Sequence, residues 1–264
     1  MKLYHGTSTK HLDSILEHGL LPRDITGVDT SKRYKYGFDY LQSAPGVVYM
    51  GKHGVSHASA TTYSDNSDGH NHLPVLIEID LADLDESRFV PDEDYAVVAF
   101  MAERRGLPKG SVVPAHSRQE EERIKDELRE IQLTLVDDIP KIQHMWRESL
   151  DYLGFLGHLG RIAPSQLSRV VTMPLDACQM NTFNELVSMA INADAHKGKR
   201  LGDTPTMDRV FEPLTRWFMG ETVSADDMQT YTRRFEPGFR RQVNRMLRRS
   251  PIVNLTKGGV LSAV

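Results

Sequence analysis

Cysteine is nearly absent from the sequence: Cys178 is the only one in 264 residues. One cysteine cannot form an intrachain disulfide, and a zinc site built from cysteines would lack three of its four ligands. Chains without disulfides are typical of reducing compartments. We therefore expect a cytoplasmic protein.

Long apolar runs are also missing. A membrane-spanning helix needs about 20 predominantly apolar residues, and the sequence contains no such run. Lys2, His5 and Lys10 interrupt the beginning of the chain, where a signal peptide would need an apolar core. The proportions of hydrophobic and charged residues, 39% and 26%, are instead typical of a soluble globular protein. We expect no membrane partner.

Charge is distributed unevenly, although the net charge is only −4. Residues 233–264 contain eight basic residues against one acid, so this end carries +7 and the remainder −11. Such an end can meet a polyanion or pack on an acidic face of its own protein. The candidate contacts lie on and just after the last expected helix: Arg240, Arg241, Arg245, Arg248 and Arg249.

The first 22 residues combine a short strand, a polar turn and a helix. Residues 2–4 favour a strand, and His5, Gly6 and Thr7 favour a polar turn. Residues 8–19 then have the cap, apolar face and terminal glycine of a helix. Gly6 would let a ligand approach the backbone, and the helix N-terminus would favour an anionic group. The alternative is an ordinary connection with a surface histidine.

The rest of the chain alternates between strand and helix signals. We expect strands at 46–50 and 74–81 and a short helix at 57–63, followed by a helical insertion at about 96–145. Apolar residues alternate with glycine over 148–160, which predicts one long strand or a bulged pair. The expected domains are residues 1–175 and a helical C-terminal extension, 176–264.

Two capping boxes refine these helices. Ser117 with Glu120 and Thr182 with Glu185 each have the hydroxyl and carboxylate spacing of a helix N-terminus. We therefore expect one helix of the insertion to begin near Ser117 and the first helix of the extension to begin near Thr182.

Three stretches together carry a family resemblance. Tyr4-His5-Gly6-Thr7 leads into a helix, Val48-Tyr49-Met50 leads into a short helix ending at Tyr63, and the strand at 75–81 leads into an Asp-rich turn. In this order the chain resembles the ADP-ribosyltransferase fold, in its diphtheria-toxin and poly-ADP-ribose-polymerase branch, over about residues 1–172. The resemblance implies an α+β fold with a split, mixed β core, a helical insertion and a helical C-terminal extension.

The resemblance also implies a function and its residues. The family splits NAD and transfers ADP-ribose to a macromolecular acceptor, here a protein or a nucleic acid, using a His–Tyr–Glu set. His5 would bind the adenosine ribose, Gly6 the nicotinamide carboxamide and Thr7 the ribose. Tyr63 would stack on nicotinamide, and Tyr49 would be the aromatic residue of the second motif strand. An aromatic face suits the planar, electron-poor pyridinium.

The catalytic acid is the departure from the family pattern. In the family the glutamate lies in a late core strand, where this chain has Gly154; Glu148 and Asp151 are the closest acids, and we assign Glu148. If neither acid reaches the site, two alternatives follow. One is the RNA 2′-phosphotransferase branch, which works with His and Arg residues and would here use Arg161 or Arg169. The other is an inactive relative that acts as a binding or inhibitory protein.

Two further groups of residues, one of histidines and one of acids, are candidate sites. His53 and His57, with His70 and His72 farther along, could be metal ligands, but the intervening glycines disfavour one helix and we predict no metal. Three consecutive acids at 92–94 could be catalytic, but adjacent side chains point in different directions. We expect them to form a capped, solvated turn.

Overall fold

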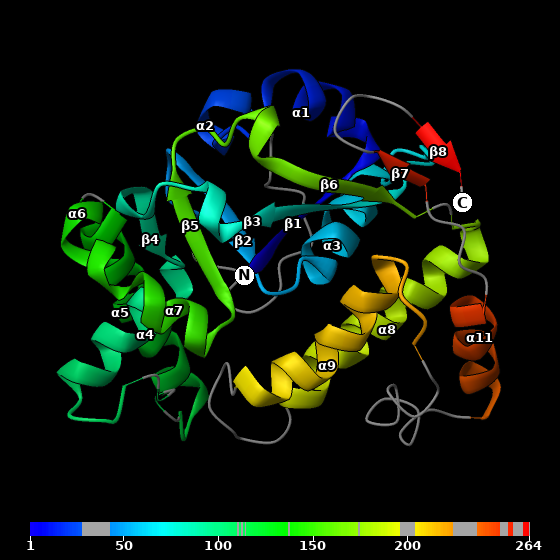
Figure 1. Ribbon diagram of the computed structural model, residues 1–264. Helices are drawn as coiled ribbons and strands as arrows, with labels where there is room; N and C mark the ends of the chain where they lie inside the picture. Colours follow the sequence, from blue (N-terminus) through cyan, green and yellow to red (C-terminus); the bar gives the residue numbers. More distant parts are fainter. Residues whose placement is uncertain are drawn as a thin grey trace.

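The chain folds into a single large antiparallel sheet with helices packed around it, which confirms the α+β class (Figure 1). The structure is a computed structural model. It describes residues 1–27, 43–109, 111, 113, 115–136, 138–173, 175–195, 204–223, 237–248, 253–255 and 261–263.

The sheet has the strand order β4-β5-β2-β1-β3-β6-β7-β8. All pairings among these strands are antiparallel, so the expectation of a mixed sheet was wrong. The physical reason is that β2 and β3 run the same way but β1 separates them. The strands are β1 (Lys2–Ser8), β2 (Val47–Gly51), β3 (Pro74–Asp80), β4 (Phe89–Pro91), β5 (Phe155–Leu159), β6 (Leu167–Thr172), β7 (Val253–Leu255) and β8 (Leu261–Ala263).

The sheet forks between β1 and β2. β1 pairs with β3 along its whole length, from Lys2 to Ser8. With β2, by contrast, it is in register at Tyr4 opposite Gly51. β2 instead pairs fully with β5, on its other side. Two half-sheets therefore diverge from the Tyr4–Gly51 contact, one containing β1, β3 and β6 and the other β2, β5 and β4.

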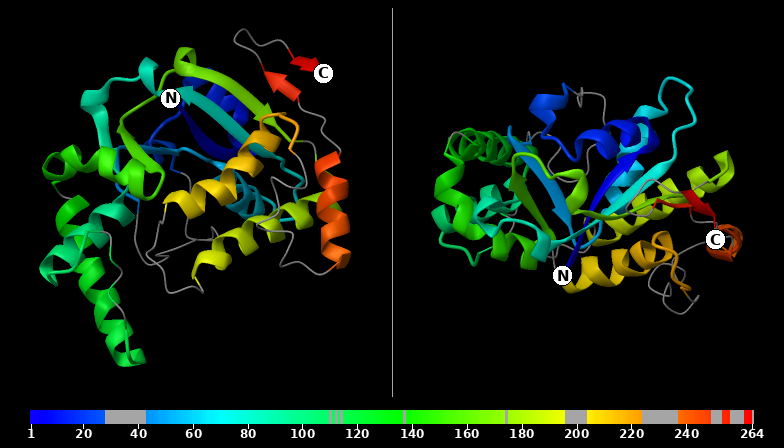
Figure 2. Two further views of the ribbon diagram at one scale, coloured as in Figure 1. Left: turned by 60° about the horizontal axis from the view of Figure 1, so that its bottom comes forward. Right: turned by 45° about the horizontal axis from the view of Figure 1, so that its top comes forward.

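Helices cover both faces and one end of this sheet (Figures 1 and 2). The helices are α1 (Leu12–His18), α2 (Arg23–Thr26), α3 (Val55–Asp65), α4 (Glu93–Arg104), α5 (Arg118–Val136), α6 (Ile139–Ile142), α7 (Trp146–Tyr152), α8 (Ala177–Ala195), α9 (Thr204–Phe218) and α11 (Pro237–Arg248). Short 3-10 turns lie at Thr9–His11, Leu81–Asp83, Glu86–Arg88, Gln143–Met145 and Pro164–Gln166. No helix in the described part of the chain is both long enough and apolar enough to cross a bilayer.

The long strand expected over 148–160 is instead a helix followed by a strand. α7 takes the first part, and the N–H of Leu153 closes its last turn on Ser149 O at 2.8 Å. Gly154 follows with φ +78°, a conformation that glycine adopts without strain. Only β5 is extended. The apolar–glycine alternation therefore combined one turn of helix, a glycine bend and a strand.

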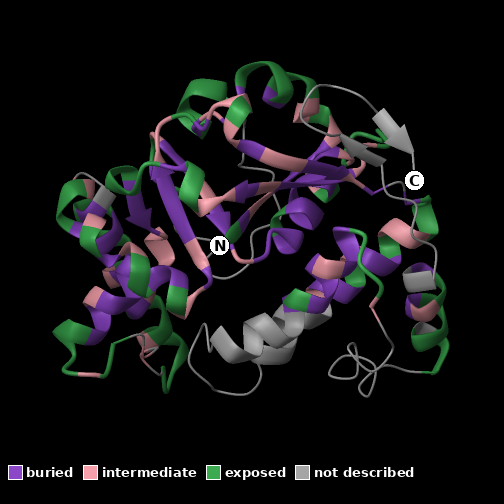
Figure 3. Cartoon of the chain, viewed as in Figure 1, coloured by how far each residue is buried: buried purple, intermediate pink, exposed green. Residues whose placement is uncertain are grey.

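The buried side chains form several clusters, of which two are decisive for the architecture (Figure 3). One contains residues of α3, β3 and β6 together with residues of α8, α9 and α11. Thus the C-terminal helices share a core with the sheet. The other lies inside the insertion, between α4, α5, α6 and the turn before α7.

Candidate functional site

His5 lies at the fork of the sheet, in β1, one residue beyond the Tyr4–Gly51 contact. Its Nδ1 is 2.8 Å from the carbonyl oxygen of Tyr49 in β2. A carbonyl oxygen only accepts hydrogen bonds, so Nδ1 carries the proton and, in the neutral ring, Nε2 carries the lone pair. The partly buried imidazole thus bridges the two half-sheets in a fixed tautomer.

Gly6 and Thr7 belong to β1 and do not form a polar turn, because all of residues 2–8 pair with β3. A Cβ on Gly6 would lie 2.0 Å from Gly54 O and 2.4 Å from Ala58 N. The first turn of α3 therefore occupies the space beside Gly6 that we had assigned to a ligand. Thr7 is only 4% exposed. Both residues pack the strand against its neighbours.

The two tyrosines of the expected site lie in different surroundings. Tyr63 is on the outer side of α3 and is 59% exposed, whereas Ala58 and Thr62 of the same helix are buried. The Tyr49 ring is partly buried among residues of β4 and α6, and its hydroxyl accepts the N–H of Ala44 at 3.1 Å. Only the backbone carbonyl of Tyr49 reaches His5.

Glu148 was expected on the late strand beside His5, and the structure contradicts that position. It lies on α7, where its carboxylate accepts hydrogen bonds from Tyr95 OH at 2.9 Å and from Lys109 Nζ at 3.0 Å. The hydrogen bond from Lys109, followed by that from Tyr95, holds the pKa of Glu148 below its ordinary value. Asp151 is on the same helix and is exposed. β5 itself contains no acid.

Phe155 is the first residue of β5 and stands opposite Gly51. A Cβ on Gly51 would lie only 2.4 Å from the phenyl ring, so glycine at 51 makes room for it. The ring also makes edge contacts with His53 and His57, with centroids 4.9 and 5.0 Å away. The late strand on which we expected the catalytic acid therefore begins with an aromatic side chain.

His53 was a candidate metal ligand in the sequence, but its burial was not predicted. It is 1% exposed and stacks on Phe211 of α9, with ring centroids 4.6 Å apart. Neither ring nitrogen has a hydrogen-bond partner. Burial, followed by the charges of His57 and Lys52, lowers its pKa to about 3. Within the described residues no group of three or more potential ligands could hold a metal ion. His53 and His57 both make edge contacts with the ring of Phe155.

A cluster of polar side chains fixes the C-terminal end of α3, at Asp65. Asp65 accepts a hydrogen bond from Ser8 Oγ at 2.5 Å, and His11 Nε2 lies 3.0 Å from the same oxygen. Burial raises the pKa of Asp65, but the contacts with His11, Ser8 and Lys10 outweigh it and hold the pKa well below the ordinary value. The serine hydroxyl faces the carboxylate and not the imidazole, so this is a structural tie and not a nucleophile–base pair.

The acids at 92–94 are partly buried, not solvated as expected. Asp92 caps α4 by accepting the N–H of Asp94 at 3.0 Å. Burial, followed by the charge of Asp92, raises the pKa of Glu93 to about 8. The apolar sequence of α4 was the signal for this burial, because Tyr95 to Ala102 nearly all face inward.

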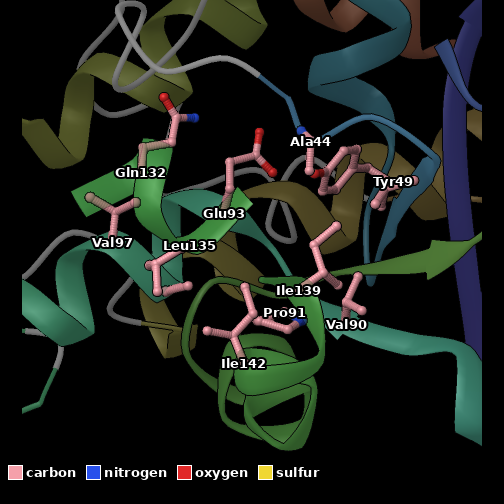
Figure 4. Close-up of a pocket in the computed structure, with 12 residues that line it drawn as sticks. Ala44, Tyr49, Val90, Pro91, Glu93, Val97, Gln132, Leu135, Ile139 and Ile142 are labelled. Carbon is pink, nitrogen blue, oxygen red and sulfur yellow. Dashed lines mark hydrogen bonds between the residues drawn. The ribbon is translucent and has the colours of Figure 1, made fainter. Parts of the chain in front are cut away.

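Glu93 borders a small pocket between the sheet and the insertion (Figure 4). The pocket encloses about 320 Å³ of empty space including its open mouth. Its walls are mostly aliphatic, with Tyr49 and Gln132 as further polar residues. Tyr49 therefore connects two places: its carbonyl accepts from His5 at the fork, and its ring borders the pocket.

The arginines expected to contact a polyanion or a phosphate lie in different parts of the fold. Arg240, Arg241 and Arg245 are exposed on α11; Arg248 belongs to the same helix, and Arg249 lies outside the described residues. Of the two arginines considered for a phosphate site, Arg161 is exposed after β5, and Arg169 lies in β6 opposite Glu78.

Comparison of the chain with protein-family models, with curated proteins and with solved structures found no match.

Proposed function

We propose that the protein transfers ADP-ribose from NAD to a macromolecular acceptor, with the dinucleotide bound at the β1–β2 fork. The observation that supports this best is the bridge from His5 Nδ1 to Tyr49 O, which fixes the histidine tautomer where the half-sheets separate. In this tautomer the acceptor lone pair of the imidazole is on Nε2, a type of atom that suits a ribose hydroxyl. The proposal rests on this geometry and on the family resemblance of the sequence.

The chemistry requires more than a bound dinucleotide. Cleavage of the bond between nicotinamide and ribose develops positive charge on the ribose, which an adjacent anion and a dry site stabilise. Tyr63 offers an exposed aromatic face on α3. Neither acid considered from the sequence supplies this anion directly. The strand β5 contains no acidic residue, and the carboxylate of Glu148 is bound to Lys109.

A second function follows from that observation. Phe155 begins the strand on which the family places its acid, and its ring contacts His53 and His57. A protein with this arrangement would bind NAD without turning it over, and would act as a binding or inhibitory protein. The RNA 2′-phosphotransferase alternative gains no specific support, since Arg161 lies in the connection after β5 and Arg169 lies in β6 opposite Glu78.

The deciding experiment is incubation of the full chain with NAD labelled in its adenine half. We expect release of nicotinamide and labelling of an acceptor in a cell extract. His5→Ala should abolish both, because it removes the bridge to Tyr49. His18→Ala, a substitution of an exposed histidine on α1, is the matched control and should leave both unchanged.

The other outcomes separate the alternatives. NAD binding by calorimetry without nicotinamide release would replace the transferase proposal with the binding protein. Consumption of NAD only in the presence of 2′-phosphorylated RNA would favour the phosphotransferase. If the protein neither bound NAD nor released nicotinamide, the proposal would be wrong. In every case Glu148→Gln should have little effect, since the Glu148 carboxylate is bound to Lys109 and Tyr95.

A further inference from the structure

The outward side of α11 carries a concentration of positive charge. The helix contains four arginines and no acidic residue. Its apolar side is docked in the shared core, where Val243 is 0% and Met246 1% exposed. Because the docked side fixes the rotation of the helix, the arginine side is turned to solvent, with Arg240, Arg241 and Arg245 exposed (Figure 3).

Helix α5 shows how this chain normally balances charge on a solvated helix. Lys125 lies 2.8 Å from Glu121, one turn earlier, and Arg129 lies 3.1 Å from Asp126. The basic residues of α5 thus have acids three or four positions away, which is the stabilising arrangement for a helix in water.

Helix α11 has the opposite arrangement. Arg241 and Arg245 are four residues apart, so two like charges share one face and destabilise the helix. Neither residue takes part in any ion pair between described residues of the chain. A helix that only faces water would be stabilised by acidic residues three or four positions from its arginines, as α5 is. On a surface that binds a polyanion, such acidic residues would repel the ligand.

We propose that the exposed arginine face of α11, defined by Arg240, Arg241 and Arg245, binds the phosphate backbone of a nucleic acid. Guanidinium groups suit this partner because they bind phosphate oxygens in a bidentate fork. A phosphate backbone repeats its charges along a line, as the arginines do along the helix. The residues that define this face are arginines and include no aromatic ring for base stacking, so the contact is to the phosphate backbone.

This inference does not depend on turnover of NAD. Binding is measured without NAD, so failure of the transferase proposal leaves it standing, and failure of binding leaves the transferase with a protein acceptor. If both hold, α11 brings a nucleic-acid acceptor to the enzyme.

The test is fluorescence anisotropy of the full chain with a labelled DNA duplex and a labelled RNA strand over a series of salt concentrations. Binding should weaken steeply with salt. The triple variant Arg240→Gln, Arg241→Gln, Arg245→Gln should reduce the slope of log affinity against log salt by roughly 2 to 3, since each neutralised phosphate contributes about 0.9. The corresponding lysine variant should retain most of the binding.

The matched control is Arg118→Gln, Arg123→Gln, Arg129→Gln, which removes the same charge from exposed positions of α5. It should bind almost as the parent does. Equal losses in the two variants would show a general charge effect and overturn the proposal. So would absence of binding at low salt, or binding to phosphatidylserine vesicles or polyglutamate but not to the oligonucleotides. Circular dichroism of each variant confirms that the helices are retained.

Discussion

The insertion and the C-terminal extension are both helical and both pack on the same sheet, but they attach to it in different ways. The insertion, α4 to α7, has an apolar cluster of its own, which includes Met101, Leu128 and Ile131. The extension has no separate cluster among its described residues: Phe211 and Val243 share one with Val55 of α3 and Leu76 of β3.

The difference teaches what each region contributes. A region with its own apolar cluster can unfold locally while the sheet stays folded, because local stability follows local burial. A region that completes the core of the sheet cannot unfold without exposing that core. The two regions also bury ionisable groups of opposite kind, His53 beneath the extension and Glu93 beneath the insertion. Acid and alkali should therefore act on different ends of the molecule.

The largest effect should come from Phe211→Ala, because it removes a fully buried ring from the shared core and leaves a cavity there. We expect a loss of about 3 to 5 kcal/mol in the free energy of unfolding. Hydrogen exchange should accelerate in β1 and β3 as well as in α9. Ile131→Ala, at an equally buried position of the insertion, should accelerate exchange chiefly in α4 and α5. If both variants changed exchange in the same elements, the distinction between the regions would be wrong.

Acid should weaken the molecule through His53. In the unfolded chain its pKa is the ordinary 6.5, and in the folded chain about 3. Between these values the unfolded state binds a proton that the folded state lacks, so stability falls as pH falls through this window. The expected loss between pH 6.5 and 5 is about 2 kcal/mol. His53→Phe keeps the stacking and should remove this part of the pH dependence in urea titrations. If His53→Phe left the pH dependence of stability unchanged, the role of His53 in acid sensitivity would be wrong. His18→Ala, at an exposed position, serves as the control.

Alkali should act through Glu93, with the opposite sign. Its pKa rises from 4.5 to about 8 on folding, so the folded state holds a proton that the unfolded state has lost. The stabilising contribution is complete below pH 4.5 and is lost as pH rises through 8. Glu93→Gln imitates the neutral acid and should remove a decline of about 1 kcal/mol between pH 7 and 8. Glu103→Gln, at an exposed position of the same helix, should leave the decline in place.

The smallest effect should come from the charge pairs of α5. Lys125→Gln removes contacts with Glu121 and Glu122 at the helix surface. We expect a loss of about 0.3 to 0.5 kcal/mol at low salt, because exposed pairs are screened. Urea titrations at low and high salt check this. A loss that persists at high salt would show that the Lys125 stem packs in the core of the insertion.

Local patterns predicted the elements well. The strands at 46–50 and 74–81 and the helix ending near Tyr63 are β2, β3 and α3. The helix start at Ser117 is also confirmed, since Glu120 N–H donates to Ser117 Oγ at 3.1 Å, whereas the Glu120 carboxylate accepts the N–H of His116 at 2.9 Å. Each of these depends on residues close together in the chain.

The predicted start of the first extension helix at Thr182 was wrong. α8 begins at Ala177, and the residues that exchange the two hydrogen bonds are Asp176 and Gln179. Thr182 lies inside the helix, where its hydroxyl donates to the carbonyl of Cys178. Asp176 lies six residues before Thr182, and the spacing of Thr182 and Glu185 did not reveal that the helix begins earlier.

The sequence by itself determined the α+β class, the strands at 46–50 and 74–81, the helix that ends near Tyr63 and the arginine side of α11, because periodicity and turn residues specify these locally. The tertiary structure alone decided what those residues meet. It put Glu148 on a helix beside Lys109, filled the space at Gly6 with α3, and buried His53 under Phe211, a residue 158 positions later. Such contacts depend on how distant segments pack, and burial sets the charge of an ionisable group as strongly as its identity does.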